Sequence, residues 1–156
     1  MRRVALRFMP LVERHLANTP DNTLSAAPVH ALPMNKPISW FEIPALDLDR
    51  ASAFYEQILA VTLNRGDMGP SALAVFPYDR DHATGGCLRS GPGMKPSVEG
   101  AIVYLNAGPS LDAALARIAP AGGSIALPRT ELPPGMGAFA QILDTEGNRV
   151  GLHSYA

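Results

Sequence analysis

Residues 41–59 read FEIPALDLDRASAFYEQIL, and this stretch predicts a strand followed directly by a helix. Asp47 suits the helix N-cap, because its carboxylate accepts hydrogen bonds from backbone N–H groups that the first turn leaves free. Apolar residues then follow the i, i+3, i+4, i+7 spacing of a helix face that packs on a sheet, at positions 51, 54, 55, 58 and 59. Three further strands are expected at 61–66, 72–78 and 83–90, separated by the turn signals MGP and DRD.

The same order of predicted elements recurs after the loop 91–98. Residues 100–118, GAIVYLNAGPSLDAALARI, superpose on residues 38–58 with about two residues of slippage, and Ser110 takes the capping position. This second helix is expected to end near Gly122 and Gly123. The later strands are expected at 99–106 (before the helix), 124–130, 137–143 and 149–154, the last two joined by a tight turn over 144–148. The sequence therefore predicts an α+β fold of two βαβββ repeats, 38–90 and 99–154. They form a curved mixed sheet around a cavity, with the helices on the convex face.

Composition limits the kind of protein. The chain has 156 residues, of which 47% are hydrophobic and 17% charged, as in one globular domain with a real core. A net charge of −1 gives no basic footprint for nucleic acid, and no apolar run approaches a membrane span. Cys87 is the single cysteine, which excludes an internal disulfide and favours a reducing cytoplasm. Residues 1–33 are interpreted as a disordered extension or linker, or as lying upstream of a true start at Met34, which leaves one domain over 34–156.

Three segments together resemble a known family. They are the strand–helix unit 41–59, the mid-chain GGCL at 85–88, and the closing LDTEGNRVGLHS at 143–154. They resemble the vicinal oxygen chelate superfamily, which includes glyoxalase I, extradiol dioxygenases and bleomycin-resistance proteins, and most of all a branch related to lactoylglutathione lyase. The resemblance implies the two-repeat fold, a small molecule bound in the concave cavity, and a homodimer. It does not select a reaction, because this fold hosts several chemistries as well as binders with none.

Metal-using members of that superfamily carry one ligand on the first and one on the last strand of each half. The resemblance puts these positions at Trp40, Cys87, Ala101 and Gly151. A catalytic metal needs about three protein ligands, and Trp, Ala and Gly offer none. A slip of two residues keeps the same strand face and gives a second set: Glu42, Arg89, Val103 and His153. That set holds two plausible ligands, so we expect neither a metal nor another cofactor, and a metal-dependent lactoylglutathione lyase or dioxygenase is the less favoured alternative.

Strand alternation assigns the two faces of the sheet. Toward the helices it puts a uniformly apolar set: Phe41, Ile43, Leu88, Ile102, Tyr104, Val150 and Leu152. Toward the cavity it puts a mixed set: Trp40, Glu42, Cys87, Arg89, Ala101, Val103, Gly151 and His153. The contrast between the two sets supports this assignment.

Two residues of the cavity set are candidate catalytic groups. Glu42, a carboxylate on an inward strand face, either pairs with Arg89 or another partner, or carries a raised pKa that suits a general base. His153 is its candidate acid–base partner or an anion binder; the alternative is an exposed histidine near the C-terminus. Arg89 either clamps an anionic ligand or pairs with Glu42.

Candidate ligand-binding residues suggest a second kind of function. Trp40 either stacks on a planar ligand or fills the space a metal would occupy, and Cys87 reads as an inert buried thiol. Met136 lies in the loop 131–137, which is either a lid or an ordinary connection. Together with Phe76 and Phe139, these residues favour a module that binds an aromatic or drug-like compound. Glu42, Arg89 and His153 favour a metal-independent lyase or isomerase.

Overall fold

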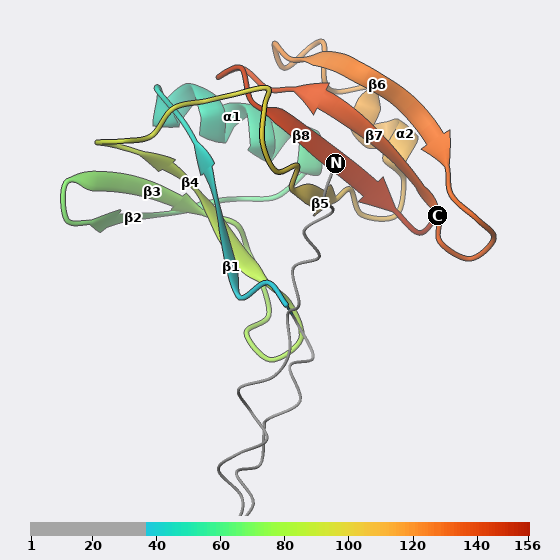
Figure 1. The fold of residues 1–156 in the computed structure, drawn as a ribbon, viewed down its shortest axis with the longest axis horizontal. Coiled ribbons are helices and arrows are strands. Elements are labelled where there is room, and N and C mark those ends of the chain that lie inside the picture. The colour runs from blue at the N-terminus through green and yellow to red at the C-terminus, as the bar shows by residue number, and fades with distance from the viewer. Residues whose placement is uncertain (1–36) are drawn as a thin grey trace, which may run out of the picture. The chain divides into compact units, whose positions relative to one another are not determined.

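The computed structural model describes residues 37–156, so the predictions for residues 1–33 lie outside the described residues. The N-terminal half contains β1 (Trp40–Pro44), α1 (Leu48–Leu59), β2 (Asn64–Met68), β3 (Ser71–Val75) and β4 (Gly85–Ser90). The C-terminal half contains β5 (Tyr104–Asn106), α2 (Leu111–Leu115), β6 (Ser124–Glu131), β7 (Ala138–Leu143) and β8 (Arg149–Ser154). The predicted α+β fold of two βαβββ repeats is confirmed (Figure 1).

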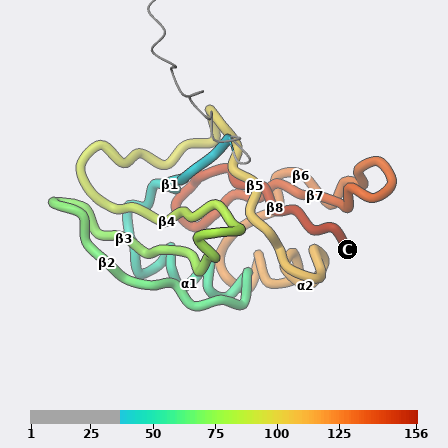
Figure 2. The backbone as a smooth tube through the Cα atoms, turned by 90° about the horizontal axis from the view of Figure 1, so that it is seen from below, coloured from blue at the N-terminus to red at the C-terminus, as the bar shows by residue number. Residues whose placement is uncertain are grey.

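Each half forms one four-stranded mixed sheet with the same strand order. The orders are β1-β4-β3-β2 and β5-β8-β7-β6, so the first strand of each half runs parallel to its last strand. Helix α1 packs on β3 and β4, α2 packs on β6, β7 and β8, and the two helices contact each other. Figure 2 shows the two helices together on one side of β1, β4, β5 and β8. The opposite face of each sheet is left without a helix.

The predicted helix caps form as the sequence indicates. The Asp47 carboxylate accepts from the backbone N–H groups of Asp49 and Arg50, both at 3.0 Å, and α1 begins at the next residue. The Ser110 hydroxyl accepts from the N–H of Ala113 at 3.2 Å and begins α2. Each cap satisfies donors that have no partner inside the helix.

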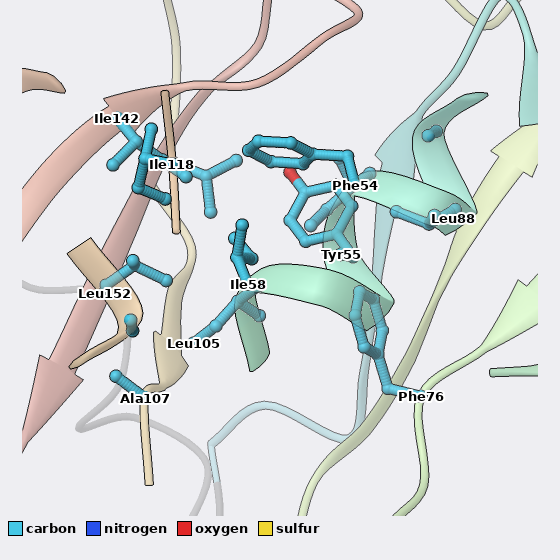
Figure 3. Packing of buried hydrophobic residues seen from close by; sticks show 14 of the residues in the cluster. Phe54, Tyr55, Ile58, Phe76, Leu88, Leu105, Ala107, Ile118, Ile142 and Leu152 are labelled. Atoms are coloured by element: carbon cyan, nitrogen blue, oxygen red, sulfur yellow. The ribbon is translucent and has the colours of Figure 1, made fainter. Parts of the chain in front are cut away.

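One core joins the two halves. Phe54, Tyr55 and Ile58 of α1 are almost fully buried and point toward the apolar residues of both sheets (Figure 3). Ile142 and Leu152 approach from the C-terminal sheet, and Phe76 and Leu88 come from the N-terminal half. None of the helices in the part of the chain that the structure describes is long and apolar enough to cross a membrane.

The face assignment at the start of the C-terminal half was wrong. The predicted strand 99–106 is shortened to Tyr104–Asn106, with Leu105 buried and its two neighbours exposed. Tyr104 therefore lies on the open face, opposite Gly151, instead of in the core. A shift of one residue reverses the face of every side chain in a strand. Residues 101–105, AIVYL, are continuously apolar, so alternation could not set the register, which pairing with β8 fixes instead.

Candidate functional site

The candidate base Glu42 forms an ion pair on the open face of the N-terminal sheet. Arg89 Nη1 donates to Glu42 Oε2 at 2.8 Å, and Arg89 Nε donates to Ser71 Oγ at 3.2 Å. The two charged side chains are 29% and 24% exposed, so they are shielded from water without being sealed off. The sequence left open whether Glu42 and Arg89 pair with each other, and in the structure they do. The negative charge of the carboxylate is therefore compensated within the protein.

Cys87 lies beside this ion pair, and its thiol is unreactive. It is the Cα partner of Glu42 in the sheet and is fully buried. Burial raises the pKa of the Cys87 thiol to about 11, and the negative charge of Glu42 adds to that effect. A hydrogen bond from Trp40 and the charge of Arg89 act in the opposite direction and are outweighed. At neutral pH the thiol stays protonated, which is the state expected of an inert buried cysteine.

In each half, an aromatic ring of the first strand lies against a glycine of the last strand. Trp40 is opposite Gly85, and Tyr104 is opposite Gly151. A Cβ placed on Gly85 would come within 2.6 Å of the Trp40 ring, and one placed on Gly151 would collide with the Tyr104 ring. The rings therefore fill the space beside these two glycines.

These pairs bear directly on a metal site. Glu42 is opposite Cys87 and Tyr104 is opposite Gly151, so Trp40 corresponds to Ile102, and the predicted third position, Ala101, was misplaced by one residue. Ala101 precedes β5 and belongs to no strand. Within residues 37–156 no three His, Cys, Asp or Glu side chains come together as a metal group would require. The donor set present does not fit the metal centre that other members of the superfamily use.

The candidate residues of the C-terminal sheet form a separate cluster. His153 Nε2 lies 2.8 Å from the backbone oxygen of Met136, and the His153 ring packs edge-on against Tyr155. Phe139 packs edge-on against Tyr104. Among the described residues, no hydrogen bond, ion pair or ring contact joins Glu42 to His153. The structure thus brings Trp40, Glu42, Cys87 and Arg89 together on one sheet and leaves His153, Met136 and Phe139 on the other.

A cavity of about 710 Å³, here named the seam cavity, lies where β1, the end of α1, the β3–β4 connection and β5 meet. Its walls are mainly apolar and aromatic: Ile38, Phe41, Leu59, Val61, Phe76, Pro77, Tyr78, Ala83, Thr84 and residues 101–106. No Asp, Glu, Lys, Arg or His belongs to this wall. The volume falls within the range of about 300–1,000 Å³ that small-molecule sites occupy.

Several residues of the seam cavity were missed or misassigned from sequence. Phe76 was expected beside the concave face; it is instead a core residue, packed on Tyr55 and Phe41, that also borders the cavity. Tyr78 was placed at the end of a strand but belongs to the β3–β4 connection, where its ring packs edge-on against Trp40. The aromatic side chains near the end of a predicted strand were the signal that could have marked this wall.

Glu42 faces a different and smaller cavity of about 170 Å³. That cavity carries charges of both signs, from Glu42, Glu99, Lys95 and Arg149. The two cavities are adjacent and share Ala101 and Val103, but Glu42 belongs to the wall of the smaller one alone. The charged side chains therefore line the smaller cavity and not the neighbouring aromatic one.

Comparison with known proteins agrees with this architecture. Residues 37–152 match the model of the Glyoxalase/Bleomycin resistance protein/Dioxygenase superfamily, and the chain belongs to that family. No curated protein sequence matches the chain.

Solved structures of the family share the fold at low sequence identity. A mutant of glyoxalase I from Zea mays is 22% identical with a TM-score of 0.59, over 78% of this chain and 47% of its own. The trypanothione-dependent glyoxalase I of Leishmania major is 19% identical (TM-score 0.56, 77% of this chain and 87% of its own). TnmS3, an antibiotic binding protein from Streptomyces sp. CB03234, is 22% identical (TM-score 0.54, 76% of this chain and 95% of its own). The chain thus spans about half the length of the maize enzyme.

Proposed function

We propose that this protein is a binding module that holds a small, neutral aromatic molecule in the seam cavity, without a metal ion. The observation that carries the proposal is the wall of that cavity, which combines four aromatic rings with aliphatic side chains and lacks every charged residue type. Ligand pockets of proteins are typically apolar with a few polar groups that fix orientation. Burial of apolar ligand surface is the favourable term for such a site.

The position of the charged residues supports binding over catalysis. A general base must reach the proton that it removes, within about 3 Å or through one water. Glu42 pairs with Arg89 and lines the smaller, mixed-charge cavity instead. A ligand in the seam cavity would therefore meet tyrosine hydroxyls and amides but no carboxylate. One solved structure of the same fold, TnmS3, is described as an antibiotic binding protein, which is consistent with a binder on this scaffold.

Two wider expectations belong to the same proposal. The protein is proposed to act as a homodimer in a reducing cytoplasm, as the family resemblance and the single free thiol Cys87 suggest. Sedimentation of the full chain at micromolar concentration tests the first: a species of about twice 16.5 kDa is expected. A single monomeric species would overturn this part and leave the ligand proposal intact.

The binding proposal is tested by blocking the cavity. Ala83 lines the seam cavity from an exposed position, so Ala83→Trp should place a ring in the opening without disturbing the core. Calorimetric titration of the full chain with 9-fluorenone, a neutral planar aromatic ketone, should show saturable binding that falls at least tenfold in this variant. Ala126→Trp, on the exposed strand β6, is the matched control and should bind like the parent chain. Equal binding by all three proteins would contradict the proposal.

A further inference from the structure

Three polar side chains of the seam cavity wall already form one hydrogen bond each within the protein. Asn106 Oδ1 accepts from the backbone N–H of Gly108 at 2.8 Å, which fixes the orientation of the amide. The Tyr104 hydroxyl oxygen accepts from Gln141 Nε2 at 2.8 Å. The Thr84 hydroxyl donates a hydrogen bond to the backbone oxygen of Ile38. The first two contacts each occupy one acceptor lone pair and leave the N–H donors of Asn106 and the O–H donor of Tyr104 for a ligand.

Asn106 is the most directional of these groups. With Oδ1 engaged, its Nδ2 carries two N–H donors and no acceptor, and no other group among residues 37–156 bonds to this side chain. Tyr104 can add one O–H donor. The neighbouring wall is apolar: Ile102, Val103 and Leu105 come from the same segment. A ligand that displaces water from this end of the cavity must therefore bring an acceptor, or leave an N–H donor without a partner.

Glu42 in the first strand of the N-terminal half provides a contrast with Asn106. Glu42 lies opposite Cys87 and corresponds to Tyr104, which lies opposite Gly151, so both cavities have a wall residue from this position. Glu42 has its charge matched by Arg89, whereas Asn106 is neutral and keeps free donors. A neutral donor in an apolar wall favours a neutral acceptor, because a carboxylate entering that wall would lose its hydration without gaining a cation.

We infer that the seam cavity selects aromatic ligands that carry a carbonyl-type hydrogen-bond acceptor, and that Asn106 is the residue that determines this selectivity. The inference rests on the proposed function, since it names the ligand class of the same cavity. Sites built to hydrogen-bond a ligand group discriminate strongly against the analogue that lacks it, because the donor of the protein is then left unpaired.

A matched set of probes tests the inference on the full chain. Fluorene and 9-fluorenone have the same ring skeleton and differ at one carbon, where fluorenone carries a carbonyl group. Calorimetry should show fluorenone binding at least about fivefold more tightly than fluorene, the effect of one neutral hydrogen bond. Fluorene-9-carboxylate, which adds a negative charge at that carbon, should bind more weakly than fluorenone.

Asn106→Asp is the decisive variant. The carboxylate keeps an oxygen for the N–H of Gly108 and has nearly the same shape, but it replaces the free N–H donors with a negative acceptor. The preference for fluorenone over fluorene should disappear in this variant. Asn64→Asp on the exposed strand β2, away from the cavity, is the control and should keep the preference. Thermal melts of both variants show whether they are folded, and Asn106→Ser offers a second, uncharged replacement that should also reduce the preference.

The outcomes separate this inference from the function beneath it. If neither fluorene nor fluorenone binds the parent chain, the proposed aromatic cavity itself is wrong. If both bind equally, or if Asn106→Asp and Asn106→Ser keep the full preference, the cavity stands and the role of Asn106 is overturned. A preference that is lost only in the Asn106 variants supports the inference.

Discussion

The connection between the last two strands differs sharply between the two halves, although its place in the fold is the same. In the C-terminal half it is the short β7–β8 turn, residues 144–148, whose side chains form hydrogen bonds within the turn and with the N-terminal half. In the N-terminal half it is the longer β3–β4 connection, residues 76–84, which lines the seam cavity. A duplicated unit can therefore use one copy of a loop for stability and the other for binding.

The β7–β8 turn holds the halves together through buried polar groups. Tyr55 of α1 donates its hydroxyl to Asp144 Oδ2 at 2.8 Å, and burial raises the pKa of Tyr55 so that this donor stays protonated. Glu146 Oε2 accepts from the backbone N–H groups of Leu46 and Asp47, both at 2.9 Å. Asn148 Nδ2 donates to the backbone oxygen of Pro44. Every one of these bonds spans the two halves.

The β3–β4 connection is fastened mainly at its ends. The N–H of Phe76 donates to the backbone oxygen of Gly86, and the Thr84 hydroxyl donates to that of Ile38. Between them, Asp79 accepts from the N–H of Asp81 and lies 2.8 Å from the His82 ring, contacts that stay within the connection. This arrangement leaves the rings of Phe76 and Tyr78 available to form a wall.

The largest expected effect comes from breaking the turn of the C-terminal half. Asp144→Ala removes the acceptor of Tyr55 and of three groups within the turn, all in a buried setting. Buried donors left without partners cost about 1–3 kcal/mol each, so the free energy of unfolding should fall by about 3 kcal/mol or more. Urea unfolding followed by the fluorescence of the single tryptophan measures it.

Asp79→Ala is the matched change in the other connection. Asp79 is exposed, so its loss should lower the free energy of unfolding by less than about 1 kcal/mol. Equal losses at Asp144 and Asp79 would contradict the division of roles between the two connections.

The second effect compares the Cys87 thiol with a more exposed position on the last strand of the other half. With a pKa of about 11, Cys87 is almost wholly protonated at pH 8, so iodoacetamide should alkylate the folded protein about a hundredfold more slowly than an unhindered thiol. The rate should rise with pH until the pH passes the pKa. Mass spectrometry of timed samples measures it.

The control uses a more exposed position on the last strand of the other half. His153 is half-buried and lies two residues after Gly151, the residue of β8 that corresponds to Cys87. In a Cys87→Ser background, His153→Cys should react faster than native Cys87. A native Cys87 that reacts as quickly as a small thiol would disprove the buried environment described for it.

The third effect concerns the two glycines under aromatic rings. At Gly85 a new Cβ meets both Trp40 and Tyr78, whereas at Gly151 it meets Tyr104, whose side chain can move outward. Overpacking lowers the free energy of unfolding by about 1–3 kcal/mol. The loss should lie at the upper end of this range for Gly85→Ala and at the lower end for Gly151→Ala. Chemical denaturation of both variants measures the difference.

Gly66→Ala provides the control for these substitutions, because a Cβ there has nothing within 4 Å. It should leave the stability within about 0.5 kcal/mol of the parent. If Gly85→Ala were as harmless as Gly66→Ala, the contact between the Trp40 ring and the strand would be refuted.

The smallest effect is expected at the ion pair. Glu42→Gln removes one partner of a partly exposed pair, which should change the free energy of unfolding by about 1 kcal/mol or less. Because Glu42 lines the smaller cavity, the affinity for fluorenone should not change. Calorimetry of this variant distinguishes binding in the seam cavity from catalysis by Glu42. Loss of fluorenone binding would favour a site on the open face in which the Glu42 carboxylate takes part.

Much of this fold could be predicted from the sequence because its signals are local. Asp47 and Ser110 mark the helix starts, and residues 144–148 form the predicted turn. The face of β5 could not be predicted, since residues 101–105 are apolar at every position and only pairing with β8 decides which ones are buried.

The candidate site was only partly predictable for a related reason. Alternation placed Glu42 and Arg89 on one face, and the structure pairs them. The seam cavity depends on how two strands, a helix end and a connection meet, which no periodicity reports. Tyr78 and Asn106 therefore carried no signal that singled them out.

The most direct test of the account is to map where a neutral aromatic ligand binds. Amide chemical shifts of the ¹⁵N-labelled full chain, recorded during titration with 9-fluorenone, report the site residue by residue. The account predicts that the changes cluster at Phe41, Val61, Tyr78, Leu105 and Asn106, around the seam cavity. Changes centred on Glu42 and Arg89, or no saturable change at all, would contradict it.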